Sequence, residues 1–68
     1  MAKVIDQFSV DKYTALILDI DNILKVKFRY IIIDGGKYRA YIMHNCHKTI
    51  YIEHLGDFVG KEVEFSVD

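Results

Sequence analysis

The chain has 68 residues, of which 51% are hydrophobic and 28% charged, and its formal net charge is −1. This length suits one domain and is too short for two, so we expect a single domain over residues 1–68. The apolar content is well above that of disordered chains, and no apolar run approaches the roughly 20 residues that cross a bilayer as a helix.

The stretch 13–20 is the first predicted element, and it admits two interpretations. Its apolar residues fit helical spacing as well as an extended strand. A helix would place Asp19 and Asp21 at its C-terminal end, where the helix dipole disfavours anions. We therefore predict a strand and keep the helix as the alternative.

Residues 24–33 alternate between apolar and mostly cationic side chains, which is typical of a half-buried strand. Asp34, Gly35 and Gly36 follow and supply the positive-φ positions of a hairpin turn. Residues 38–44 then resume an extended pattern. The sequence therefore predicts a hairpin centred on residues 34–36.

The C-terminal third contains two further predicted strands, over residues 48–54 and 62–67. Between them, residues 55–60 are too short for a helix and indicate a turn or a single helical turn, with Phe58 or Val59 closing the open end of the sheet. In the last strand the odd-numbered residues are apolar. We expect it to bury Val63, Phe65 and Val67.

Three-residue hairpin loops at 21–23, 34–36 and 45–47 would set the register of the whole sheet, because even-numbered residues would then face one another across every pair. The odd-numbered face would pair Asp19 with Lys25 and Arg39 with Glu53, which are opposite charges. The even-numbered inner face would comprise Leu16, Leu18, Ile20, Leu24, Val26, Phe28, Tyr30, Ile32, Tyr38, Ala40, Ile42, Ile50 and Ile52.

These elements predict an all-β fold, a small five-stranded antiparallel meander or barrel with a short helical turn before the last strand. In strand count this outline resembles Src-homology-type, Sm-like and oligonucleotide/oligosaccharide-binding barrels. An AbrB-like swapped hairpin, with strands over 49–53 and 61–67, is the alternative outline. No family motif is matched residue by residue, so no functional residue is carried over from any of these folds.

The side chains that could bind a transition metal or act as nucleophile gather in one region: His44, Cys46, His47 and His54. Zinc prefers imidazole and thiolate ligands, but the chain has no Cys-x-x-Cys pair and two of the four residues lie in a tight loop. The glycines match neither a phosphate loop nor a dinucleotide fingerprint. We predict no enzyme, no bound metal and no cofactor.

The N-terminal segment lacks the apolar stretch and the small-residue cleavage site of a secretory signal. Cys46 is the single cysteine, so an intramolecular disulfide is excluded. We expect a cytoplasmic protein.

The odd-numbered face carries the candidate binding site. Its register would set Arg29, Tyr41 and Tyr51 in one row. Small barrels that bind single-stranded nucleic acid combine cations, which contact phosphates, with rings on which bases stack. An isoelectric point near 6.3 opposes this function, since many nucleic-acid-binding domains lie above about 9. We predict a non-enzymatic module that binds single-stranded nucleic acid through Lys27, Arg29, Lys37, Tyr41 and Tyr51.

The same face admits two other interpretations. Ile17, Ile31, Ile33 and Met43 are also expected there, and a contiguous apolar patch marks an interface. Residues 24–41 carry five cationic side chains and one acidic side chain, whereas the last strand is acidic, which favours edge-to-edge pairing. The alternative function is therefore homo-oligomerisation or binding of a protein partner, and the third interpretation is a solvated face without a partner.

Overall fold

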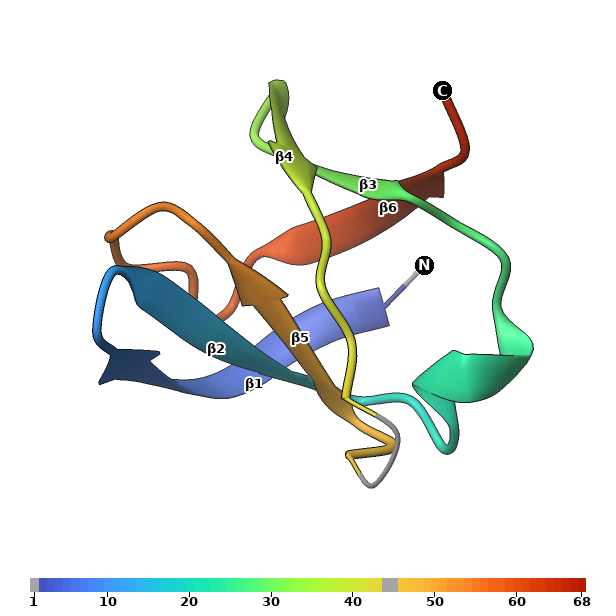
Figure 1. The fold of residues 1–68 in the computed structure, drawn as a ribbon, viewed down its shortest axis with the longest axis horizontal. Helices are drawn as coiled ribbons and strands as arrows, with labels where there is room; N and C mark the ends of the chain where they lie inside the picture. The colour runs from blue at the N-terminus through green and yellow to red at the C-terminus, as the bar shows by residue number, and fades with distance from the viewer. Residues whose placement is uncertain (1, 44–45) are drawn as a thin grey trace.

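The computed structural model describes residues 2–43 and 46–68, which form an all-β domain with one six-stranded antiparallel sheet (Figure 1). The strands are β1 (Ala2–Val10), β2 (Tyr13–Leu18), β3 (Tyr30–Ile33), β4 (Gly36–Arg39), β5 (Thr49–Ile52) and β6 (Glu62–Ser66), with a 3-10 turn η1 (Ile23–Lys25). The predicted all-β class is confirmed. The described part of the chain contains no helix long and apolar enough to cross a membrane.

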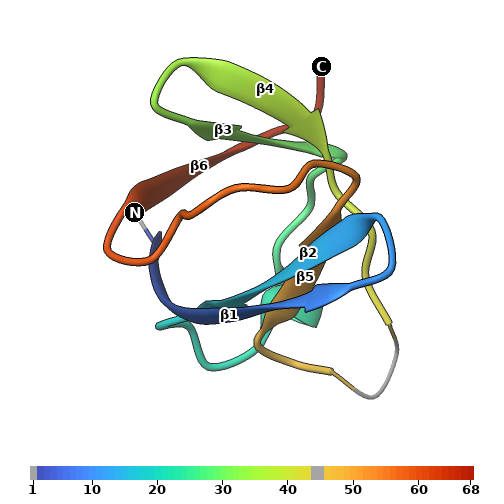
Figure 2. The same cartoon turned by 90° about the vertical axis from the view of Figure 1, so that its left-hand side faces the viewer.

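The strand order is β4-β3-β6-β1-β2-β5, so the expected five-stranded meander is wrong in order and in strand count. The sheet is strongly curled, and the β3–β4 hairpin with β6 lies over β1, β2 and β5 (Figure 2). A bulge between Val4 and Asp6 interrupts the β1–β2 ladder, and bulges bend the strand that carries them. An isolated bridge between Tyr41 and Tyr51 brings the chain after β4 against β5, although the sheet does not close into a barrel.

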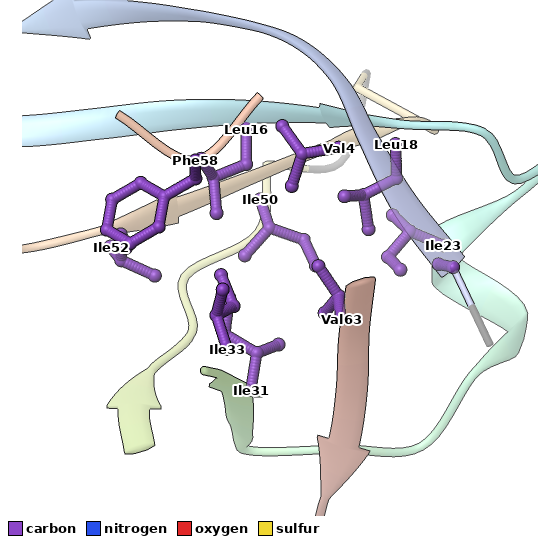
Figure 3. Close-up of a cluster of buried hydrophobic side chains, with 11 residues drawn as sticks. Val4, Leu16, Leu18, Ile23, Ile31, Ile33, Ile50, Ile52, Phe58 and Val63 are labelled. Carbon is purple, nitrogen blue, oxygen red and sulfur yellow. The ribbon is translucent and has the colours of Figure 1, made fainter. Parts of the chain in front are cut away.

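The hydrophobic core lies between the two halves of the curled sheet, where side chains from both halves point toward one another (Figure 3). Most of these residues are isoleucine, leucine and valine, which pack well on a pleated surface. The core comprises Ala2, Val4, Leu16, Leu18, Ile23, Ile31, Ile33, Ile50, Ile52, Phe58 and Val63.

Within the segment 13–20, residues Tyr13–Leu18 form a strand, as predicted, and the helical alternative is wrong. Residues 24–29 form no strand, which corrects the prediction for 24–33. The side chain of Asn22 accepts a hydrogen bond from the Leu24 N–H (3.0 Å) and caps the 3-10 turn, which buries Ile23 and leaves Leu24 exposed. Phe28 still packs on the core, with its ring 4.9 Å from that of Phe65.

The β3–β4 turn is shorter than expected. Asp34 (φ 51°) and Gly35 (φ 79°) form a two-residue loop in which both residues have positive φ, the requirement of a type I′ turn. Ile33 therefore pairs with Gly36, and the odd-numbered Ile31 and Ile33 face the core. The even-inward register is wrong for β3.

Other strands keep the predicted parity. Leu16, Leu18, Ile50 and Ile52 are buried, and Ile20, Tyr38 and Ala40 pack against the core. Ile42 is exposed, which corrects its inner-face placement. In β6, Val63 is buried and Phe65 packs on the core, as expected, but Val67 is exposed.

The predicted cross-strand ion pairs do not form, because β2 pairs with β1 and β5 and not with residues 24–33. Asp19 instead accepts a hydrogen bond from the backbone N–H of Lys3 (2.7 Å). The carboxylate of Glu53 pairs with Lys12 (3.3 Å) and leaves Arg39 without it.

The loop before β6 closes one end of the core, as predicted, with Phe58 buried and Val59 exposed. The helical turn expected in this loop does not form, and the 3-10 turn of the described residues lies at Ile23–Lys25 instead. The Gln7 side chain holds this loop on the edge of β1. Its Nε2 donates to the carbonyl of Gly56 and its Oε1 accepts from the N–H of Phe58, and both distances are 2.6 Å. The buried Thr14 hydroxyl donates to the carbonyl of His54 (2.6 Å), so the loop is anchored at both ends.

Candidate functional site

A row of aromatic rings crosses the outer face of β1, β2 and β5. Phe8 pairs with Ala15, Ala15 with Tyr51, and Tyr51 with Tyr41. Directly opposed residues share a face of the sheet, so three rings stand on one face around the small Ala15, which is fully buried. Phe8 and Tyr41 are 47% and 43% exposed. We call Phe8, Tyr41 and Tyr51 the ring row.

An apolar pocket of about 310 Å³ lies beside the ring row. The rings of Tyr13 and Tyr41 meet edge to face within it, with centroids 5.8 Å apart at an angle of 82°. Val10 and Met43 at its rim are 43% and 55% exposed, so the pocket opens to solvent. We call it the aromatic pocket; its lining residues are Val10, Tyr13, Tyr41, Ile42, Met43 and Tyr51.

The strand β4 carries two cationic side chains, those of Lys37 and Arg39. The Lys37 ammonium lies 4.7 Å from the centroid of the Tyr30 ring, and the Arg39 guanidinium lies 5.8 Å from it. Lys37 and Arg39 are alternate residues of β4, so their side chains project from the same side of that strand at an interval of about 6.6 Å, and Tyr41 follows two residues later, beyond the end of β4. We call Lys37, Arg39 and Tyr30 the basic strip.

The carboxylates near this face are distributed unevenly. Glu53 pairs with Lys12, and the hydrogen bond from Lys12 to Glu53, followed by the attraction of its charge, raises the pKa of Lys12 above its ordinary value. Among the described residues, the other ion pair joins Lys61 to Asp34, so Lys37 and Arg39 have no carboxylate partner there. Across β3, however, Ile32 pairs on one side with Lys37 and on the other with Glu64.

The outer face of β3, β4 and β6 therefore carries positive charge on β4 and negative charge on β6. Glu62 and Glu64 lie on β6 and are exposed. An anionic ligand should therefore follow β4 and keep away from β6.

Two of the predicted site residues lie together, since Tyr41 and Tyr51 pair in the ring row, whereas Lys37 lies on β4 in the basic strip. The predicted row of Arg29, Tyr41 and Tyr51 is wrong. Arg29 donates its N–H to the Ser66 carbonyl (2.8 Å) and its carbonyl accepts from the Ala40 N–H (2.9 Å), so it lies between Ser66 and Ala40 and is not opposite Tyr41.

Lys27 and Arg29 line another pocket, of about 570 Å³, with residues 67–68 of the C-terminal end. Sequence reasoning missed six residues of the basic strip, the ring row and the aromatic pocket: Phe8, Val10, Tyr13, Tyr30, Arg39 and Ile42. The parity shared by Lys37, Arg39 and Tyr41 was a usable signal for Arg39, but the expected pairing with Glu53 concealed it.

The four residues expected at an interface separate into two groups. Ile31 and Ile33 are 0% and 2% exposed and belong to the core, so their placement on the outer face is wrong. Ile17 is half-buried on the same outer face as the ring row, and Met43 borders the aromatic pocket. Exposed Phe8, Val10 and Ile42 extend this apolar surface.

Two of the three histidines, His47 and His54, lie within the described residues. His44 lies outside the described residues, and the described ones contain no group of three or more His, Cys, Asp or Glu side chains that could hold a metal ion. The His54 ring packs on Tyr38 (5.0 Å) and Phe58 (6.0 Å between centroids). The carbonyl of His47 accepts the N–H of Ile23 (2.6 Å).

No family model, curated protein or solved structure matches this chain. Its function therefore has to be inferred from the basic strip, the ring row and the aromatic pocket.

Proposed function

We propose that the domain is a non-enzymatic, cytoplasmic binding module that holds single-stranded nucleic acid along the basic strip and the ring row. The observation that carries this proposal is the order of groups along the chain, in which the two cations of β4, Lys37 and Arg39, are followed two residues later by Tyr41 of the ring row. The N–H of Tyr41 donates to the Tyr51 carbonyl (2.9 Å) and the N–H of Tyr51 donates to the Tyr41 carbonyl (2.8 Å), so the second ring has a fixed place next to the first.

The physical basis is a division of roles between charge and stacking. Lys37 and Arg39 contact phosphates, and Tyr41 and Tyr51 stack bases, each stacked base contributing about 1–3 kcal/mol. Rings on an exposed sheet face need unpaired bases, so single strands are preferred to duplex. Glu64 on β6 repels phosphates and confines the strand to the β4 side.

Salt dependence tests the phosphate contacts. Two contacts predict that the logarithm of the affinity falls with the logarithm of salt concentration with a slope of about −1.4, since each contact on a single strand contributes about −0.7. Arg39→Gln should make the slope shallower by about 0.7. Fluorescence anisotropy with a labelled deoxythymidine oligonucleotide at several salt concentrations measures both values.

Arg29→Gln is the matched control, because Arg29 is also exposed but lines the other pocket. It should leave the slope unchanged. Absence of binding at low salt would end the proposal, and equal losses in the two variants would show that the basic strip has no special part in binding.

A second candidate function is self-association or docking of a protein partner through the apolar surface around the ring row. Its support is the exposure of Phe8, Val10, Ile42 and Met43 on adjoining strands and segments. Edge-to-edge pairing through the acidic last strand is not part of it, because β6 lies inside the sheet between β3 and β1.

If two copies associate through this surface, Met43→Lys should shift the domain from dimer to monomer, because a lysine at a half-exposed position is tolerated in the monomer but not in an apolar interface. Sedimentation velocity over a range of protein concentrations measures the change. A wild-type profile that stays monomeric at high concentration would exclude self-association, while leaving a foreign partner to be sought.

A further inference from the structure

We infer that the aromatic pocket takes one unpaired nucleobase of the bound strand, an inference that rests on the proposed function and assigns a further site to it. The pocket volume, about 310 Å³, lies at the lower end of the roughly 300–1,000 Å³ found for small-molecule sites. Apart from Tyr41 and Tyr51, its lining comes from residues outside the basic strip and the ring row: Val10, Tyr13, Ile42 and Met43.

The apolar and aromatic walls of the pocket suit the face of a flat ring. Tyr13 and Tyr41 contact each other edge to face at 82°, so two aromatic rings nearly at a right angle form part of the lining. Apolar atoms of Val10 and Met43 contact the face of a base without hydrogen-bonding demands. Methionine sulfur also makes favourable contacts with aromatic ring edges.

The charges indicate how a base reaches the pocket. Arg39 precedes Tyr41, one wall of the pocket, by two residues, so it is the cation of the basic strip nearest to the pocket along the chain. The ammonium group of Lys12 lies 5.7 Å from the centroid of the Tyr13 ring, and its charge is neutralised by the carboxylate of Glu53. The uncompensated positive charge is thus on the Arg39 side, and the strand is expected to enter from there.

A pocket-filling variant tests the inference. Val10→Phe would occupy the pocket while leaving Lys37, Arg39, Tyr41 and Tyr51 in place. Affinity for a tetranucleotide of deoxythymidine should fall by about five- to 150-fold, the range of one stacked base. In the wild type, a single abasic substitution at one position of the tetranucleotide should cause a loss of the same size, and in Val10→Phe that substitution should cause none.

Val59→Phe is the matched control, because Val59 is exposed to a similar degree and lies in the loop before β6. It should bind as the wild type does. Met43→Phe fills the pocket from its other side and replaces Val10→Phe if thermal melting shows that variant to be unfolded.

The outcomes separate the two proposals. A wild type that binds no oligonucleotide at low salt overturns the proposed function itself. Unchanged oligonucleotide binding in folded Val10→Phe or Met43→Phe overturns the pocket inference while the proposed function stands. If those variants instead lose self-association and keep oligonucleotide binding, the pocket belongs to a protein interface and the inference is wrong.

Discussion

Replacing Ile33 by lysine is expected to unfold the domain, whereas the same change at the neighbouring Ile32 should leave it folded. Ile33 is 2% exposed in the core, and an unpaired buried charge costs several kcal/mol. That is comparable to the whole stability of a domain of this size, about 5 kcal/mol. Ile32 is half-buried on the outer face between Glu64 and Lys37, where a lysine gains a carboxylate neighbour on one side that offsets the like charge on the other.

Far-UV circular dichroism and thermal unfolding of the two variants measure the contrast. The reverse result, with Ile32→Lys unfolded and Ile33→Lys folded, would restore the even-inward register and contradict the two-residue turn at Asp34 and Gly35. The expected result also means that lysine at Ile31 or Ile33 cannot probe self-association, since the fold is lost first. Met43→Lys is the suitable probe.

Local signals in the sequence predicted the strand character, the hairpin at residues 34–36 and the buried Phe58, because each depends on neighbouring residues. The strand β1 was not predicted. Its bulge after Val4 shifts the face that later residues occupy, so Val4 points into the core while Ile5 and Phe8 are exposed and no period of two runs through the segment.

The register of β3 was mispredicted because Asp34-Gly35-Gly36 fits two loops. Asp34 tolerates positive φ, which allows a two-residue turn and moves Gly36 into β4. One residue of difference in loop length reverses which side chains of β3 face the core. Strand order was beyond local patterns, since β6 and β1 insert between segments that are close in sequence.

The neighbours of a candidate site residue were predicted correctly only where the predicted strand register matches the structure. Tyr41 and Tyr51 are paired as the register required. Arg29 was displaced because residues 26–29 connect the two halves of the sheet and continue beside β6, contacts that depend on the distant Ser66. Phe8 was not predicted as a site residue, because it lies on β1 and the sequence pattern did not predict that strand.

Removing both tyrosine rings of the ring row should cause the largest loss of oligonucleotide binding. Tyr41→Leu combined with Tyr51→Leu retains apolar cover over Ala15 and removes two stacking surfaces, worth about 2–6 kcal/mol together, so affinity should fall at least about 30-fold. The salt slope should persist, because Lys37 and Arg39 remain. Anisotropy titration of the double variant measures both quantities.

Phe28→Leu is the control for this double variant, since it also exchanges an aromatic ring for leucine but in the other pocket. It should bind as the wild type does. If the double variant kept wild-type affinity while Arg39→Gln lost it, phosphate contacts alone would account for binding. The exposed rings would then have no part in oligonucleotide binding. That result would favour the second candidate function, in which the rings contact a protein partner.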